Sequence, residues 1–222
     1  CASRLPGYLD FNTLHTTHGR ALAFATGIKL ANPRLKVIVV SGDGDATAIG
    51  GNHLIHAARR NMDITLICMN NNIYGMTNGQ YSPMTPTSML ATTAPYGNLE
   101  RNFDLCKLVE GCGANYVARA TAAHPRNISQ YIEYALTHKG FQFVEVMTQC
   151  PTYYGRRNKL GGPVEMINSL KQNTILNTAA AKLPPEKLEG KIQIGEFVKK
   201  EELTYLDRFD AMVDRITGGV KP

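Results

Sequence analysis

Hydrophobic positions along the chain fall into short continuous runs separated by stretches with helical spacing. Residues 36–41, 63–69 and 142–148 are runs rich in Val, Ile, Leu, Phe and Met. Continuous runs of this kind are typical of parallel strands that are buried on both faces. A shorter run at residues 116–120 fits the same pattern. The chain therefore predicts four strands of a buried sheet.

Helical patterns lie before, between and after these runs. Apolar residues recur at helical spacing in four segments, residues 18–31, 47–60, 103–110 and 125–138. Strands that alternate with helices predict an α/β fold, with an open, mainly parallel sheet flanked by helices. Residues 70–102 are rich in Asn, Thr, Pro, Gly and Met. A loop of this length in a compact domain is usually functional or disordered.

The pattern changes after Pro151. Glycines and prolines interrupt the chain, a helix is expected over residues 164–181, and a last helix is expected over residues 201–216. Pro184, Pro185 and a charged stretch separate these two helices. We therefore expect an α/β domain over residues 1–150 and a helical C-terminal extension over residues 151–222.

Composition narrows the class of protein. The 43% of hydrophobic residues is enough to build a core, but no apolar run approaches the length of a membrane span. The net charge of +6 comes from scattered Lys and Arg, which argues against a nucleic-acid surface. Five irregularly spaced cysteines form no disulfide framework, and they predict a cytoplasmic chain. Because the chain begins without Met, we expect further sequence upstream.

Two polar motifs follow the first two predicted strands. Gly42-Asp43-Gly44 ends one run, and the triplet at residues 70–72, Asn-Asn-Asn, ends the next. Ligands of open α/β sheets bind at the carboxyl ends of the strands, and Mg²⁺ prefers oxygen ligands from carboxylates and phosphates. The helix after Gly44 would point its free amides at the same place. Together the motifs predict a divalent cation that bridges a diphosphate. Taken alone, Gly-Asp-Gly could also be a plain turn with an Asp cap.

The two motifs resemble the thiamine diphosphate motif of decarboxylases, acetolactate synthases and transketolases. Residues 73–83, which read Ile-Tyr-Gly-Met-Thr-Asn-Gly-Gln-Tyr-Ser-Pro, resemble more narrowly the β subunits of 2-oxoacid:ferredoxin oxidoreductases. Residues 17–21, 50–53 and 150–152 resemble the same subunits, most closely those of the 2-oxoglutarate branch. The resemblance extends from Cys1 to about residue 157. One departure is Asn78, where the family usually has Gly, but Asn tolerates the left-handed region.

The resemblance implies a set of site residues. The Mg²⁺ ligands would be Asp43, Asn71 and the carbonyl oxygen of Ile73, and His18 would be a catalytic residue near the diphosphate. His18 could equally cap a helix. Further contacts with thiamine diphosphate would come from the turn after the first strand and from the long loop: Gly42, Gly44, Asp45, Tyr74, Thr77 and Gln80. Residues 1–150 would then be the domain that binds thiamine diphosphate and Mg²⁺.

Two cysteines resemble ligands of an iron–sulfur cluster. Cys1 and Cys150 correspond to two of the four ligands of the family's [4Fe–4S] cluster, and the other two would lie in an upstream Cys-x-x-Cys. Because four thiolates are the usual requirement, residues 1–222 alone should not hold an intact cluster. The alternative is that both are ordinary small hydrophobic side chains. We assign Cys68, Cys106 and Cys112 to packing.

The resemblance also implies an activity. It is the oxidative decarboxylation of a 2-oxoacid, with 2-oxoglutarate favoured, to CO₂ and an acyl-coenzyme A, with electrons passed through the cluster to ferredoxin. We find no candidate for the glutamate that activates the coenzyme, so an α subunit should supply it in a hetero-oligomer. No nucleic-acid or membrane partner is expected. The alternatives are a non-oxidative thiamine diphosphate subunit, similar to a decarboxylase or acetolactate synthase, and a non-catalytic nucleotide-binding module.

Overall fold

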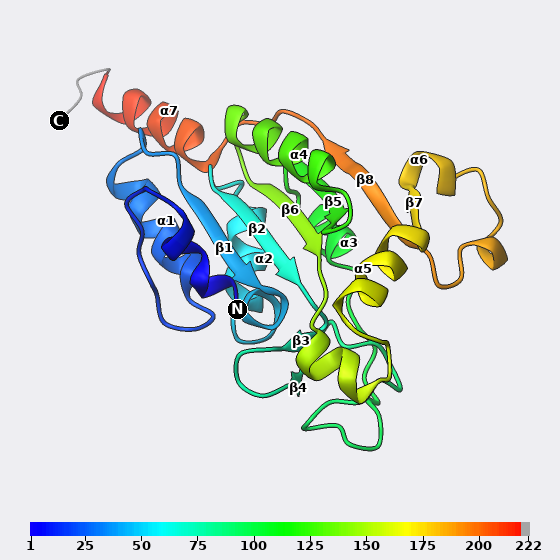
Figure 1. Cartoon of the computed structure of the whole chain (residues 1–222). Coiled ribbons are helices and arrows are strands. Elements are labelled where there is room, and N and C mark those ends of the chain that lie inside the picture. The colour runs from blue at the N-terminus through cyan, green and yellow to red at the C-terminus, as the bar shows by residue number, and fades with distance from the viewer. Residues whose placement is uncertain (219–222) are drawn as a thin grey trace.

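A six-stranded sheet with helices on both faces forms the centre of the protein in the computed structural model, which describes residues 1–218 (Figure 1). The strand order is β1-β2-β6-β5-β8-β7. The first four strands in this order pair in parallel, which confirms the α/β fold predicted from the sequence. The strands are β1 (Ile38–Gly42), β2 (Thr65–Asn70), β5 (Tyr116–Thr121), β6 (Gln142–Met147), β7 (Thr174–Leu176) and β8 (Ile192–Lys199).

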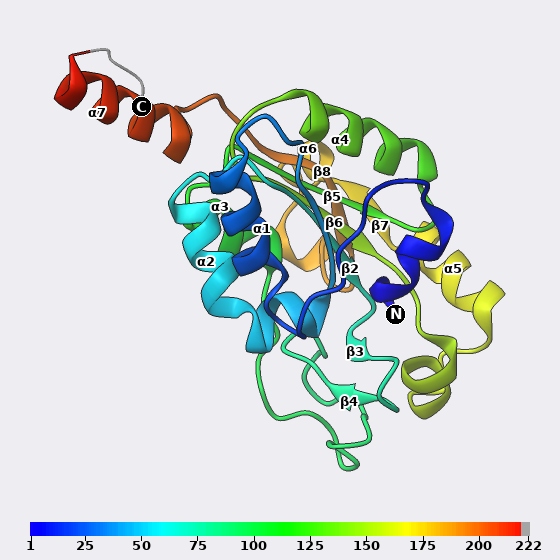
Figure 2. The ribbon, with the colours of Figure 1, turned by 90° about the vertical axis from the view of Figure 1, so that its left-hand side faces the viewer.

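Helices cover both faces of the sheet (Figure 2). The helices are α1 (Ala21–Ala31), α2 (Gly51–Arg59), α3 (Leu105–Gly111), α4 (Pro125–Thr137), α5 (Pro163–Gln172), α6 (Asn177–Ala180) and α7 (Tyr205–Thr217). Shorter helical turns are η1 (Ala2–Tyr8), η2 (Asp45–Ile49), η3 (Pro151–Gly155) and η4 (Pro185–Lys187). None of the helices within residues 1–218 combines the length and the apolar character needed to cross a membrane.

The helices pack against the sheet through two hydrophobic clusters. On one face, Leu54 of α2 and Val109 of α3 pack with Leu66 of β2 in a cluster that also includes α1. On the other face, Ala135 of α4 packs against Val144 of β6. Each fully buried Leu or Val contributes about 1.5–3 kcal/mol relative to an exposed one, so the clusters hold the strand ends in fixed positions.

Two helices begin at other residues than the sequence predicted, because glycines determine the backbone conformation there. The first helix begins at Ala21 rather than at residue 18, because Gly19 has φ +72° and cannot belong to a right-handed helix. The second opens as the wide turn η2, in which the amide of Gly50 donates to the carbonyl of Asp45. A Cβ on Gly50 would lie 2.3 Å from that carbonyl oxygen, so this turn requires glycine.

The expected long loop contains a small hairpin. Strands β3 (Ile73–Tyr74) and β4 (Gln80–Tyr81) pair in antiparallel fashion, and the rest of residues 70–102 is mainly loop. The hairpin turn carries Asn78 at φ 83° and Gly79 at φ 89°, so Asn78 occupies the left-handed region as expected. The Tyr153 hydroxyl donates to Asn78 Oδ1 at 2.7 Å and ties the turn to η3.

The prediction of one continuous helix over residues 164–181 is wrong. α5 ends at Gln172, and β7 and α6 follow it. The sequence prediction also missed β8, which pairs with β5 in antiparallel fashion and with β7 in parallel. This pairing satisfies backbone groups at the edge of β5 that would otherwise have no partner. The extension is therefore helical only in part, and it shares one sheet with the α/β domain. The boundary at residue 150 stays a prediction.

Candidate coenzyme site

The two polar motifs meet at one edge of the sheet. Gly42 at the end of β1 is in register with Met69 of β2, and Asn70 at the end of β2 is in register with Met147 of β6. The carboxyl ends of three neighbouring strands therefore lie side by side, as the sequence predicted. The β3–β4 hairpin and the N-terminus lie at the same end of the molecule (Figure 1).

Asp43 is a buried carboxylate at this edge. Its side chain is 2% exposed, and it accepts hydrogen bonds from the Ser82 hydroxyl at 2.5 Å and from the backbone amide of Asn71. Burial raises the pKa of Asp43 to about 6, although these donors lower it. A buried anion is costly unless it is paired or coordinates a metal. The environment of Asp43 thus fits the ligand of a cation.

Ser82 is a site residue that the sequence analysis did not assign. Its side chain is fully buried, and its oxygen also accepts from the amide of Met84 at 3.2 Å. Ser82 follows β4, far along the chain from Asp43, and a serine in a polar loop carries no signal of its own. Ser82 belongs to residues 73–83, which resemble the 2-oxoacid:ferredoxin oxidoreductases, but the sequence does not show its partner.

The Asn triplet forms a tight double turn. The Asn70 side-chain oxygen accepts from the amide of Asn72 at 3.0 Å, and the Asn71 side-chain oxygen accepts from the amide of Ile73 at 3.2 Å. Asn72 adopts φ 63°. Asn side chains form such local turns readily and tolerate the left-handed region. The backbone amide of Asn71 donates to Asp43, so the turn begins beside that carboxylate. The assignment of Asn71 and the Ile73 carbonyl as ligands of Mg²⁺ stays a prediction.

Tyr74 connects the hairpin to the first turn. Its hydroxyl donates to the carbonyl of Gly44 at 2.9 Å, and a Cβ on Gly44 would lie 2.3 Å from the ring. Gly44 is therefore required by the close approach of the tyrosine. Burial raises the pKa of Tyr74, and the nearby Asp43 and Asp45 add to the effect. The hydroxyl consequently stays protonated and keeps donating.

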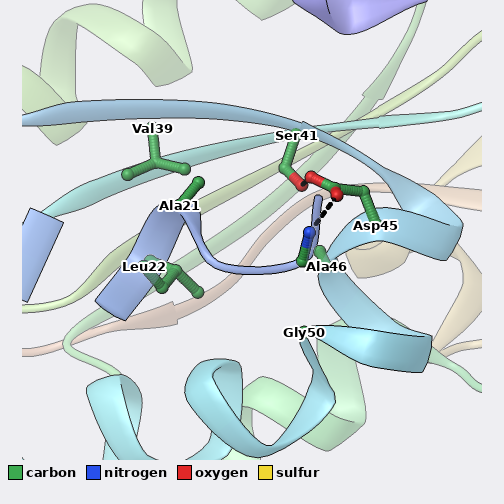
Figure 3. A pocket seen from close by; sticks show the side chains of 8 residues that line it. Ala21, Leu22, Val39, Ser41, Asp45, Ala46 and Gly50 are labelled. Atoms are coloured by element: carbon green, nitrogen blue, oxygen red, sulfur yellow. Dashed lines mark hydrogen bonds between the residues drawn. The ribbon is translucent and has the colours of Figure 1, made fainter. Parts of the chain in front are cut away.

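Asp45 organises the backbone around the turn. One carboxylate oxygen accepts from the amide of Gly19 at 2.6 Å, and the other accepts from Ser41 (Figure 3). The first oxygen also pairs with His18 Nδ1 at 2.5 Å. These bonds occupy the side chain, and the contact of Asp45 with a diphosphate stays a prediction. The cavity of about 10 Å³ beside Asp45 has room for about one water molecule and not for a coenzyme.

The remaining predicted residues lie around this edge. His18 has a side chain that is 55% exposed, and its ring contacts Tyr74 edge to face at 5.9 Å. Thr77 and Gln80 hydrogen-bond each other at 2.5 Å across the hairpin turn. The catalytic role of His18 and the coenzyme contacts of Thr77 and Gln80 stay predictions.

Cys1 and Cys150 come together at Gly75. A Cβ on Gly75 would lie 3.2 Å from the sulfur of Cys1 and 3.6 Å from the sulfur of Cys150, so both thiols reach the same glycine. No group of three or more His, Cys, Asp or Glu side chains in the described part of the chain forms a metal site. Two convergent thiols fit two of the four ligands of a four-cysteine cluster, but the role of Cys1 and Cys150 as cluster ligands stays a prediction.

The other three cysteines lie in the core. Cys68 and Cys106 belong to the main hydrophobic cluster, and Cys112 packs against it. Burial raises the pKa of all three thiols, which keeps them protonated and unreactive. Their surroundings agree with the packing role assigned from the sequence.

Comparisons with known proteins agree with this geometry. Residues 2–146 match the family described as thiamine pyrophosphate enzyme, C-terminal TPP binding domain. The 2-oxoglutarate synthase subunit KorB of Methanothermobacter marburgensis is 54% identical over 220 residues, which are 99% of this chain and 77% of that protein. Its counterpart from Methanocaldococcus jannaschii is 52% identical over 97% of this chain and 80% of that protein.

A solved structure is similar over nearly the whole chain. The 2-oxoglutarate:ferredoxin oxidoreductase from Magnetococcus marinus, with 2-oxoglutarate, coenzyme A and succinyl-CoA bound, matches with a TM-score of 0.85 and 36% identity. The match covers 99% of this chain and 75% of that one. The resemblance stated from the sequence is confirmed: this chain belongs to the thiamine pyrophosphate enzymes and, among them, to the β subunits of the 2-oxoglutarate:ferredoxin oxidoreductases.

Proposed function

We propose that this chain binds thiamine diphosphate and Mg²⁺ in an enzyme that oxidatively decarboxylates 2-oxoglutarate. The products would be CO₂ and an acyl-coenzyme A, with electrons delivered to ferredoxin. The observation that carries the proposal is the buried Asp43 beside the turn of Asn71, at the tips of neighbouring strands. Its environment suits a cation that links protein to diphosphate.

Each residue at the edge would have a defined task. Asp43, Asn71 and the Ile73 carbonyl would hold Mg²⁺, and the amides of Gly44 and Asp45 would bind the diphosphate. Tyr74 and the Asp45 side chain would hold these turns in place. The coenzyme would supply the electron sink for decarboxylation, while the protein would anchor and orient it. Gly42, Thr77 and Gln80 would complete the contacts.

His18 would accept or donate a proton near the diphosphate. Its pairing with Asp45 occupies Nδ1 and leaves Nε2 to hold or release a proton. None of the residues that we place at the coenzyme is a glutamate. An α subunit would therefore supply the carboxylate that activates the coenzyme, and the site would be complete only in the hetero-oligomer.

Cys1 and Cys150 would be two ligands of a [4Fe–4S] cluster, with two more from a segment upstream of residue 1. Their convergence at Gly75 favours the oxidoreductase over a non-oxidative thiamine enzyme, which needs no such thiols. All five cysteines are free thiols, which agrees with a cytoplasmic location.

The test uses the full-length protein assembled with its α subunit. We expect reduction of ferredoxin that depends on 2-oxoglutarate and coenzyme A, together with iron and acid-labile sulfide in the assembly. Asp43→Ala should abolish the activity and the cation-dependent binding of thiamine diphosphate. If Asp43→Ala kept the affinity for the coenzyme, the proposal would be wrong. Activity without iron or sulfide would favour the non-oxidative alternative.

A further inference from the structure

A buried carboxylate lies behind the Asn triplet. Asn70 is fully buried, and its side-chain nitrogen donates to Oε1 of Glu145 at 2.7 Å. Glu145 lies on β6, beside β2, and is also fully buried. Its position inside the sheet means that no solvent helps to stabilise its charge, so its protein partners must do so.

Arg119 on β5 is the charged partner of this carboxylate, whose Oε2 also accepts from the Cys106 thiol at 3.6 Å. Its Nε donates to Oε2 of Glu145 at 2.6 Å, so Arg119 and Asn70 bind different oxygens of one carboxylate. The outer end of Arg119 pairs with Asp104 at 2.6 Å, where the Asp104 side chain is 40% exposed. Side chains of three neighbouring strands, Arg119 of β5, Glu145 of β6 and Asn70 of β2, thus form one hydrogen-bonded chain.

Stability alone does not explain this arrangement. Desolvating a buried ion pair costs several kcal/mol per ion, and well-packed hydrophobic residues often replace such a pair without loss. A carboxylate, however, only accepts hydrogen bonds, so it makes the Asn70 side chain turn its nitrogen inward. The Asn70 oxygen then faces the amide of Asn72, which it binds at 3.0 Å. A hydrophobic pair could not impose this orientation.

We propose that Glu145 is a positioning residue that, through Asn70, fixes the turn presenting Asn71 and the Ile73 carbonyl to the cation. The inference rests on the proposed function, because it needs a cation at Asp43 and Asn71. Arg119 pairs with Glu145 and orients its carboxylate. Neither Glu145 nor Asn70 touches the cation, and their effect is on the shape of the turn.

The variants follow from the hydrogen bonds. Asn70→Ala removes the three hydrogen bonds of the side chain, to Glu145, Met147 and Asn72, but keeps the Arg119–Glu145 pair. Glu145→Gln can accept from Arg119 or from Asn70 through its one oxygen, but its amide group would oppose the other donor. Asp104→Asn is the matched control, because it weakens an ion pair of the same arginine at the exposed end and leaves Glu145 and Asn70 in place.

The experiment measures cation binding and folding separately. The full-length protein, assembled with its α subunit and freed of metal, is titrated with Mn²⁺ in the presence of thiamine diphosphate, and binding is followed by electron paramagnetic resonance. Loss of partners that orient metal ligands typically weakens metal affinity about 10–100-fold, which we expect for Asn70→Ala and Glu145→Gln. Asp104→Asn should bind as the wild type does. Melting of the metal-free assembly reports folding.

The double variant decides between positioning and general destabilisation. If Glu145 acts through Asn70, adding Glu145→Gln to Asn70→Ala should cost no further cation affinity. Additive losses, or wild-type affinity in folded Asn70→Ala, would overturn the inference, as would an equal loss in Asp104→Asn. Should Asn70→Ala fail to assemble, Asn70→Ser takes its place under the same criteria. A wild-type assembly that binds no Mn²⁺ with the coenzyme would refute the proposed function instead.

Discussion

The hydroxyl of Ser82 donates a 2.5 Å hydrogen bond to the carboxylate of Asp43, and both side chains are buried. This bond joins the turn after β1 to the segment after β4. It holds the carboxylate in one orientation before any cation binds. The long loop thus supports the candidate coenzyme site through a residue, Ser82, that is not among the proposed ligands of the metal or the diphosphate.

Replacing Ser82 by Ala should weaken Mg²⁺ binding. A hydrogen bond to a charged group contributes about 1.5–3 kcal/mol, and its loss leaves the ionised Asp43 less stabilised and less well oriented. We expect the affinity for Mg²⁺ in the presence of thiamine diphosphate to fall about tenfold, measured by calorimetric titration. Thr87→Ala serves as the control, since Thr87 donates to the Glu100 carbonyl on the exposed side of the same loop. Equal affinities of the two variants would contradict the prediction.

Cation binding should also depend on pH through Asp43. Its pKa of about 6 means that protons compete with the cation for the carboxylate in weakly acidic solution. The affinity for Mg²⁺ should therefore be constant well above pH 6 and fall as the pH drops through that value. Titrations from about pH 5 to pH 8 measure this, after subtraction of Mg²⁺ binding to free thiamine diphosphate over the same range. A flat profile would show that Asp43 does not ligate the cation.

Asp43 should destabilise the metal-free protein at neutral pH. Because the pKa of Asp43 is raised, the folded state binds the proton of this carboxyl more tightly than the unfolded state does. The stabilisation of the folded state by the protonated carboxyl is present below about pH 4 and is lost as the pH rises to about 6. Asp43→Asn should increase the free energy of unfolding by about 1–3 kcal/mol at pH 7.5 and by little at pH 4. Urea unfolding of the metal-free protein tests this, and a less stable variant at pH 7.5 would contradict it.

Much of the site could be predicted because its signals are local in the sequence. Continuous apolar runs placed the tips of β1 and β2, and the motifs at Asp43 and Asn71 end those runs directly. The carboxyl ends of parallel strands meet by geometry, so two local patterns were enough to bring these residues together.

The rest depends on contacts between distant segments. Ser82 lies in a loop whose path no local pattern predicts, and Glu145 reads only as a charged residue inside an apolar run. Its partner Arg119 lies on another strand, and the pairing follows from the strand order. β8 was missed because Gly195 interrupts its alternation and because only its pairing with β5 and β7 makes it a strand.

The convergence of Cys1 and Cys150 leads to a last prediction. Both sulfurs approach Gly75, whereas Cys112 lies at the end of α3 and packs against the core. In the full-length assembly, Cys150→Ser should lower the iron and sulfide content and abolish ferredoxin reduction, because a cluster needs four thiolates. Cys112→Ser is the matched control and should keep both. Measured iron that is equal in the two variants would mean that Cys150 serves only to pack against η3 and the hairpin.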